Sequence, residues 1–249
     1  MSIASEITRL QGVKSDILQA IADKGVTVPS DSMLDDCPDL IASIGDGFGS
    51  VVIGGRSYKT IVMPDGKEWL AENLDYKWTG LDIGPAGTPS TQAAWYYNND
   101  EATYGIDGTY KCGLLYNWYA VEYLETNKSI LLPDGWHVAS KSEWENLAST
   151  IPVGATTAAL QLKSIDLSVS PTFPNNWNGI DAYGFSEIPC GARYSDFTDI
   201  GTYALIWTAT KIDSSNAHGK ALGASDNSIL SSYYTDKTGA YSIRLVKGT

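Results

Sequence analysis

The stretch that decides the fold is Asp134-Gly135-Trp136-His137-Val138-Ala139-Ser140, which Glu143 and Trp144 follow shortly afterwards. Ser140 and Glu143 have the spacing of a capping box, in which each side chain bonds the other residue's backbone at a helix start. Trp144 and Leu147 then give the segment an apolar face at helical spacing. This pattern predicts a helix over 140–150.

On either side of residues 134–150 the sequence patterns favour short strands and one more helix. Leu115, Trp118 and Tyr123 share helical spacing and predict a helix over 115–125. Val51-Val52-Ile53 is followed by Gly54-Gly55 and a second apolar run to Met63, which predicts a hairpin. Residues 69–74 predict a short strand or turn, and 79–113 lack periodicity and predict a long loop region. Residues 183–247 predict several short strands, so the fold class is α+β with β prominent.

Length and charge narrow the function. A chain of 249 residues can bury a large core without a disulfide or metal staple. Its net charge of −12 argues against nucleic acid and anionic membranes as partners. No apolar run is long enough to cross a membrane, and residues 1–6 lack a secretory signal. The three cysteines have no metal-ligand spacing, so we expect buried free thiols.

Residues 1–48 differ from the rest and form the first expected domain, an attachment or oligomerisation segment. Ile3, Ile7, Leu10, Ile17 and Ile21 follow the a/d rhythm of a heptad seam, with Lys14 at the skipped position. We expect a helix over 3–24 that either packs on its own domain or joins copies of the chain into a homotrimer. A short helix is expected after Pro38, and a linker over 45–49.

The residues that catalysis needs do not form a recognisable group. The chain has two histidines: His137, expected to be a satisfied core residue, and His218, expected in a loop of small residues. No G-x-S-x-G elbow, H-E-x-x-H, EF-hand or phosphate loop is present. No spacing singles out a carboxylate pair for glycoside hydrolysis, and acidic pairs such as Asp100-Glu101 are expected to be solvated loop charges. We therefore expect no enzymatic activity, no cofactor and no metal.

The segment from Tyr194 to Ala240 is dominated by Ser, Thr, Tyr, Asp, Asn, Gly and Ala, and the acidic surplus lies outside it. Tyr, Ser, Gly and Asn are the residues that antibody paratopes favour, rigid aromatic anchors among adaptable polar groups. Two interpretations stay open on composition alone. The segment is either a ligand-binding surface or a set of loops that join strands.

Seven ordered words carry a resemblance to a known family: Lys67–Leu74, Gly113–Ala120, Asp134–Ser140 with Glu143-Trp144, Gly184–Pro189, Gly191–Arg193, Ile206–Thr210 and Tyr241–Lys247. In order and content they resemble the Fibrobacter succinogenes major paralogous domain family over about 51–247. The resemblance implies a C-type-lectin-like fold, with two helices, a twisted antiparallel sheet and long loops. It also implies a binding face built largely from the C-terminal segment. The second expected domain is therefore 49–249, with a variable region at 190–243.

The departures from the family and its fold are informative. Two cysteines that family members often carry are replaced by Leu132 and Leu245, as expected for a pair lost together in a reducing cytosol. The calcium-site words of sugar-binding lectins are absent, and Pro174–Asn178 echoes them out of order. The paired catalytic cysteines of formylglycine-generating enzymes are also missing, so an oxidase activity has no residues to carry it.

The words from Ile7 to Pro29 resemble lead-in segments of phage structural proteins. Together with a C-type-lectin-like domain, they suggest a variable receptor-binding protein of a diversity-generating retroelement. Such an element mutates adenines, so an Asn codon yields Tyr, Ser, Thr, Asp, Gly, Ala or His but never Lys, Glu, Gln, Met or Trp. The first group abounds between Tyr194 and Ala240, and the second is confined there to Trp207 and three lysines.

The sequence thus predicts a non-enzymatic receptor-binding protein of a phage tail fibre or tail tip, made in the host cytoplasm. Its partners would be a bacterial surface protein or glycan and, through the N-terminal segment, other tail proteins. The alternatives are a bacterial surface adhesin or fimbrial-tip protein and, more remotely, a polysaccharide-degrading enzyme. The expected anchors are Tyr194, Tyr203, Tyr233 and Tyr234. The expected hydrogen-bonding residues are Ser195, Asp196, Thr198, Asp199, Thr202, His218, Asp226, Ser231 and Ser232. Scaffold words place Trp69, Trp118, Trp136, Trp144 and Trp207 in the core.

Overall fold

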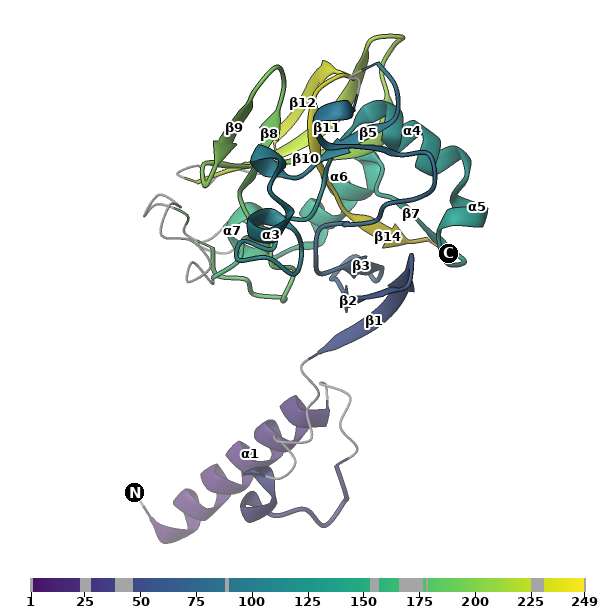
Figure 1. Cartoon of the computed structure of the whole chain (residues 1–249). Coiled ribbons are helices and arrows are strands. Elements are labelled where there is room, and N and C mark those ends of the chain that lie inside the picture. The colour runs from purple at the N-terminus through teal and green to yellow at the C-terminus, as the bar shows by residue number, and fades with distance from the viewer. Residues whose placement is uncertain are drawn as a thin grey trace. The chain divides into compact units, whose positions relative to one another are not determined.

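The structure of the chain is a computed structural model that describes residues 2–22, 28–38, 47–87, 90–152, 157–165, 177, 179–224 and 231–248 (Figure 1). The chain divides into two compact units, residues 1–48 and 49–249. No helix within the described residues is both long and apolar enough to cross a membrane.

The first unit is built on one long helix. Helix α1 spans Ile3–Ala22, which confirms the described part of the predicted helix. Ser2 begins it by accepting the Ser5 N–H at 3.1 Å. A short 3-10 helix, η1, spans Leu34–Asp36, and Ile21 near the end of α1 is buried. The helix expected after Pro38 lies outside the described residues.

The second unit opens with the predicted hairpin, which the structure confirms. Strands β1 (Phe48–Ile53) and β2 (Arg56–Val62) are joined by Gly54 and Gly55. Both glycines have positive φ, 59° and 86°, as a tight hairpin turn requires. A side chain at Gly54 would also collide with the ring of Tyr76. Phe48 and Gly49, expected in a linker, belong to β1 instead.

The strands form two sheets. The smaller has the order β1-β2-β3-β14-β7, with β3 at Glu68–Leu70, β7 at Trp136–Val138 and β14 at Leu245–Lys247. The larger has the order β12-β11-β10-β8-β13-β6-β5-β4, and β9 pairs with β8. Its strands are β4 (Asp82–Ile83), β5 (Ala93–Trp95), β6 (Leu115–Asn117), β8 (Cys190–Arg193), β9 (Phe197–Ile200), β10 (Tyr203–Lys211), β11 (Asn216–Gly223), β12 (Ser231–Asp236) and β13 (Ala240–Ile243).

Two helices of nine and ten residues accompany the sheets. Helix α6, Lys141–Thr150, has the predicted capping box of Ser140 and Glu143. Helix α4 spans Trp118–Thr126, so the predicted helix over 115–125 is wrong at its start. Helix α4 begins only after Asn117, because the Asn117 side chain caps it by accepting the Ala120 N–H at 3.0 Å. Residues 115–117 precede the helix and form β6. Shorter helices are α5 (Lys128–Leu131) and α7 (Ala158–Leu162).

The long loop expected over 79–113 is also corrected. It contains β4, β5, the short helix α3 (Glu101–Tyr104) and two 3-10 turns, η2 (Gly84–Ala86) and η3 (Tyr97–Asn99). Elements of two to four residues are too short to show a repeating hydrophobic pattern, so periodicity could not reveal them. The several strands expected over 183–247 are confirmed as β8 to β14.

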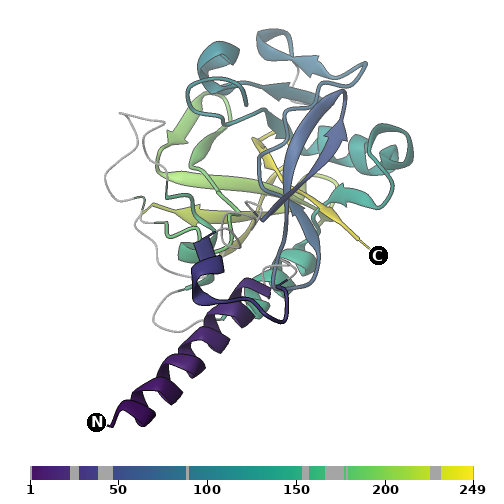
Figure 2. The same cartoon turned by 90° about the horizontal axis from the view of Figure 1, so that it is seen from below.

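The last strands join the two sheets. Strand β13 lies in the larger sheet and β14 in the smaller, with only Arg244 between them. Strand β14 pairs antiparallel with β3 on one side and β7 on the other. In Figure 2 the yellow C-terminal strands run through the middle of the domain rather than around its rim. The order of the small sheet therefore depends on residues 245–247.

The core confirms the predicted scaffold. The five tryptophans expected in the core, Trp69, Trp118, Trp136, Trp144 and Trp207, are all buried. Leu132 and Leu245, which stand where relatives often carry cysteines, belong to the same hydrophobic cluster. Cys37, Cys112 and Cys190 are buried free thiols, as expected. The fold is α+β, with twisted, mainly antiparallel sheets and the two principal helices that the family resemblance implied.

Candidate functional site

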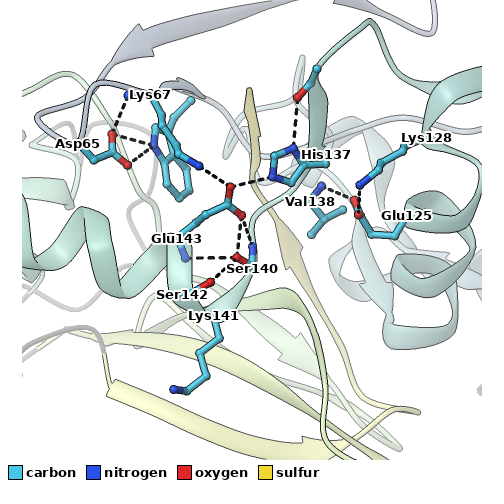
Figure 3. Close-up of polar contacts among 12 residues, drawn as sticks. Asp65, Lys67, Glu125, Lys128, His137, Val138, Ser140, Lys141, Ser142 and Glu143 are labelled. Carbon is cyan, nitrogen blue, oxygen red and sulfur yellow. Dashed lines mark hydrogen bonds and ion pairs between the residues drawn. The ribbon is translucent and has the colours of Figure 1, made fainter. Parts of the chain in front are cut away.

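A partly buried polar cluster surrounds Glu143 at the start of α6 (Figure 3). One carboxylate oxygen lies 2.8 Å from His137 Nε2 on β7 and 2.8 Å from Lys67 Nζ in the turn before β3. The other accepts the N–H and the hydroxyl of Ser140, both at 2.8 Å. His137 Nδ1 lies 3.2 Å from the Gly135 carbonyl. Both imidazole nitrogens are therefore engaged.

The electrostatics of this cluster keep Glu143 ionised and favour the charged form of His137. Burial opposes ionisation of Glu143, but hydrogen bonds from His137, Lys67 and Ser140 outweigh it and hold its pKa well below the ordinary value. The hydrogen bond to Glu143 raises the pKa of His137 against a smaller opposing effect of burial. The carboxylate binds β7, α6 and the β2–β3 turn to one another.

The same geometry does not make a nucleophile. In a catalytic triad the imidazole lies between the hydroxyl and the carboxylate. Here the Glu143 carboxylate lies between Ser140 and His137, as Figure 3 shows. The imidazole therefore has no free nitrogen with which to deprotonate Ser140. His137 is the satisfied histidine that the sequence predicted, with a hydrogen bond at each ring nitrogen.

A second polar group lines a cavity of about 280 Å³ beside β2 and α3. The Tyr96 hydroxyl lies 2.8 Å from Asp75 Oδ1 and 3.0 Å from Glu101 Oε1, so two carboxylates share one hydroxyl. A glycosidase of the acid–base type needs one carboxyl that retains its proton. The hydrogen bond from Lys77 instead lowers the pKa of Glu101. Within the described parts of the chain, no three His, Cys, Asp or Glu residues are grouped to hold a metal.

The first of the sequence-predicted binding residues lie in the turn between β8 and β9. The Tyr194 N–H bonds the Asp196 carbonyl at 3.0 Å, and Ser195 Oγ donates to the Asp196 carboxylate at 3.3 Å. The Tyr194 ring is exposed, and its hydroxyl accepts a hydrogen bond from Tyr241 at 3.0 Å. Internal bonds thus hold the turn while one face of the Tyr194 ring meets solvent.

The next group lies at the β9–β10 turn. Thr198 is half-buried in β9 opposite Ala192 of β8. Asp199 and Gly201 have positive φ, 64° and 74°, and the Asp199 carbonyl accepts the Thr202 N–H at 3.0 Å. Tyr203 follows at the start of β10 with its ring exposed. This turn presents Thr202 and Tyr203 at the end of the sheet.

His218 and Tyr234 form a cross-strand pair. His218 was expected in a loop, but it lies in β11 directly opposite Tyr234 of the edge strand β12. Residues opposite one another in a ladder share one face of the sheet. His218 Nδ1 is buried and makes no hydrogen bond to the described residues. Tyr234 is the most exposed of the four expected anchors.

Tyr233 points to the other face of the sheet. It pairs with Gly219, and a side chain on that glycine would press against the Tyr233 ring. The ring centre lies 5.8 Å from that of Tyr241, and burial raises the pKa of the Tyr233 hydroxyl well above its ordinary value. The expectation of two exposed anchors is corrected for Tyr233, since alternation turns neighbouring residues to opposite faces.

The remaining predicted residues are only partly placed. Ser231 and Ser232 lie in β12 through their backbone, and Asp226 is outside the described residues. The rings of Tyr194 and Tyr233 thus both contact the ring of Tyr241. His218 and Tyr234 lie opposite one another on the other face of the sheet. The turn residues lie at the strand ends, so the predicted residues do not form one continuous patch.

Two supporting residues escaped the sequence analysis. The Tyr241 hydroxyl donates a hydrogen bond to the hydroxyl of Tyr194. The Arg193 guanidinium lies 4.1 Å from the centre of the Trp95 ring. The alternation of the last strand was the available signal. Alternation puts Tyr241 on the same face of the sheet as the apolar Ile243, and so predicts that the Tyr241 ring is buried.

The comparison with protein families agrees with this architecture. The model of the Fibrobacter succinogenes major domain matches residues 64–247. Searches of the curated proteins and of the solved structures gave no match. The matched span begins in the β2–β3 turn and ends with β14, so β1 and β2 lie before it. It includes the larger sheet, strands β3, β14 and β7 of the smaller one, the Glu143 cluster and the buried tryptophans. The chain belongs to the Fibrobacter succinogenes major domain family.

Proposed function

We propose that the chain is a non-enzymatic receptor-binding protein whose C-terminal strands and turns bind a ligand on the bacterial surface. The observation that carries the proposal is the exposure of three tyrosines at separate places in one sheet. Tyr194 is 44%, Tyr203 41% and Tyr234 73% exposed. By contrast Tyr58, Tyr116 and Tyr241 are fully buried.

Exposed tyrosines suit recognition for physical reasons. A tyrosine ring offers a large amphipathic contact area and has only two side-chain torsions to immobilise on binding. The Tyr194 ring is already oriented by its hydrogen bond to Tyr241, and Tyr234 projects from a strand that is paired over its whole length. Binding through such pre-ordered anchors loses less conformational entropy than binding through free loops.

We assign the protein to the phage tail, as a tail-fibre or tail-tip component made in the host cytoplasm. The support is the division into two units, one that contains the α+β domain of the matched family and one with a helix suited to attachment. Under this proposal the first unit binds other tail proteins, and the second binds a bacterial surface protein or glycan. Diversification by a retroelement would act on residues 190–243.

Binding is tested with fluorescent full-length protein on a panel of intact bacteria. Replacing Tyr194, Tyr203 and Tyr234 together by Ala is expected to abolish binding. The matched control is Tyr123→Ala, because Tyr123 is a partly exposed tyrosine on α4, outside the C-terminal segment. Protease treatment of the cells removes a protein ligand, and periodate oxidation removes a glycan. Equal binding by the wild type and the triple variant would contradict the proposed surface.

Diversification has a separate test in the flanking DNA. A reverse-transcriptase frame and a near-copy of codons 190–243 that differs only at adenines are expected within a few kilobases. The differing codons would identify the binding residues one by one. Absence of both would refute diversification but leave the binding surface to the cell assay.

Two alternatives remain distinguishable. A surface adhesin of the same fold would be found on the bacterial envelope rather than in purified virions, which immunoblotting of both fractions decides. A polysaccharide-degrading enzyme would release reducing sugar from capsular polysaccharide.

A further inference from the structure

The first unit leaves an apolar surface on α1 without cover. Ile3 is 83%, Ile7 51% and Leu10 45% exposed, and Val13 beside them is also exposed. These four residues, called the N-terminal stripe below, lie along one side of the first three turns. A helix in water normally turns such a side toward other apolar groups.

The same seam is less exposed at its other end. Ile17 is half-buried and Ile21 is buried. Lys14, which occupies the intervening seam position, turns its ammonium toward the sulfur of Met33 at 3.7 Å. The exposed apolar part of the seam is therefore the N-terminal stripe, which is left for another molecule.

We propose that the N-terminal stripe joins three copies of this chain in a parallel helical bundle. Ile3 and Ile7 occupy successive core positions of a heptad, and Ile17 and Ile21 repeat them two heptads later. Isoleucine at both core positions shifts coiled coils from two strands toward three or four. The inference goes beyond ligand binding and does not rest on it.

The charges beside the stripe suit identical parallel partners. On one edge Glu6 is paired with Arg9 of its own helix at 2.6 Å. The other edge carries Ala4 and Gln11, which have no charge. In a parallel bundle one edge meets the opposite edge of the next copy. Glu6 then faces neutral residues, so no like charges oppose the assembly.

Assembly of this kind changes the strength of binding without any new ligand contact. Three copies held at one end place three C-terminal binding surfaces on a single particle. Once one surface is bound, the others bind at a high effective concentration, which can raise the overall affinity by roughly 10²–10⁴. A weak single contact would then suffice for attachment to a cell.

The test is the mass of the full-length protein by light scattering over a hundredfold range of concentration. The wild type is expected at three times the single-chain mass of 26.8 kDa. Ile7→Asp is expected to give single chains, or to need at least tenfold more protein to assemble. Thr8→Asp is the matched control, since it adds the same charge to the neighbouring position outside the stripe.

Far-UV circular dichroism shows whether α1 survives each change. Should Ile7→Asp unwind the helix, Ile7→Ala takes its place, because alanine removes the side chain and favours the helix. A wild type with the mass of one chain at the highest concentration would overturn the proposal. So would a trimer that persists in the Ile7 variants, or one that Thr8→Asp disrupts equally.

Discussion

Arg244 Nε donates a hydrogen bond to Asn73 Oδ1 at 2.8 Å, and both side chains are buried where the two sheets meet. The guanidinium also donates to the carbonyls of Leu70, Phe185 and Ser186 at 2.9–3.1 Å. One side chain between β13 and β14 therefore satisfies backbone groups from two distant segments of the chain.

Removing this guanidinium should destabilise the domain strongly. Arg244→Met keeps much of the volume but leaves three carbonyls and Asn73 Oδ1 without their donor. Each buried acceptor left unsatisfied costs about 1–3 kcal/mol, so the expected loss is at least about 3 kcal/mol. Urea denaturation measures the loss. Lys247→Met is the control, because its ion pair with Glu68 is half-exposed and worth at most about 1 kcal/mol. Equal stability of the two variants would show that the arginine network is dispensable.

Glu187 should make the stability depend on pH. Its carboxylate lies 3.1 Å from Arg244 Nε, but the single Nε hydrogen points to Asn73. Burial raises the pKa of Glu187 from 4.5 to about 7 despite the nearby Arg244. The folded state thus prefers the protonated acid, and ionisation costs stability as the pH rises from 4.5 to about 7.

Glu187→Gln, which cannot ionise, measures this contribution. The unfolding free energy of the variant relative to the wild type should increase across that pH interval and then level off. Thermal or urea unfolding at several pH values gives the difference directly. A constant difference from acid to alkaline pH would mean that Glu187 has an ordinary pKa.

His137 should also lose its stabilising contribution as the pH rises, but in a higher range than Glu187. Its folded pKa is raised by Glu143, so its contribution is complete below the ordinary value of 6.5 and is lost as the pH rises through the raised value. His137→Gln should cost about 1.5–3 kcal/mol at pH 6, as for a hydrogen bond to a charged group, and less at pH 9. The comparison with wild type at both pH values checks the sign. A larger loss at pH 9 would contradict the ion pair.

Neighbouring tyrosines on β12 should behave differently in stability. Tyr234→Ala removes an exposed ring and should change the unfolding free energy by less than about 0.5 kcal/mol. Tyr233→Ala removes a ring packed on Tyr241 and should cost about 2 kcal/mol or more. Tyr233→Phe separates packing from the hydroxyl and should be nearly neutral, because that buried hydroxyl makes no well-formed hydrogen bond to the residues that the structure describes. Similar losses for both Ala variants would place the two rings in the same environment.

The sequence predicted those elements whose local signals agree with their tertiary setting. Helix α6 and the β1–β2 hairpin could be predicted because the capping box and the glycine pair are motifs of only a few neighbouring residues. The start of α4 was misplaced because Leu115 has helical spacing but pairs with Trp95 of β5. Such pairing is a long-range contact, and it overrides the local pattern.

The candidate site was predicted less well than the fold. The composition of residues 194–240 indicated which residue types were available but not which face each would occupy. Tyr233 and Tyr234 are adjacent and chemically identical, and only the register with β11 turns one inward and the other outward. The Arg244 network was missed entirely, because its acceptors are backbone carbonyls that no motif reveals.

The position of β13 and β14 has a consequence for how the protein is made. The small sheet cannot close until residue 247 has left the ribosome, because β14 pairs with both β3 and β7. A frameshift anywhere in residues 190–240 would erase Arg244 and both strands. Folding of the domain therefore requires that residues 190–240 are translated in the correct frame, because Arg244, β13 and β14 are encoded after them.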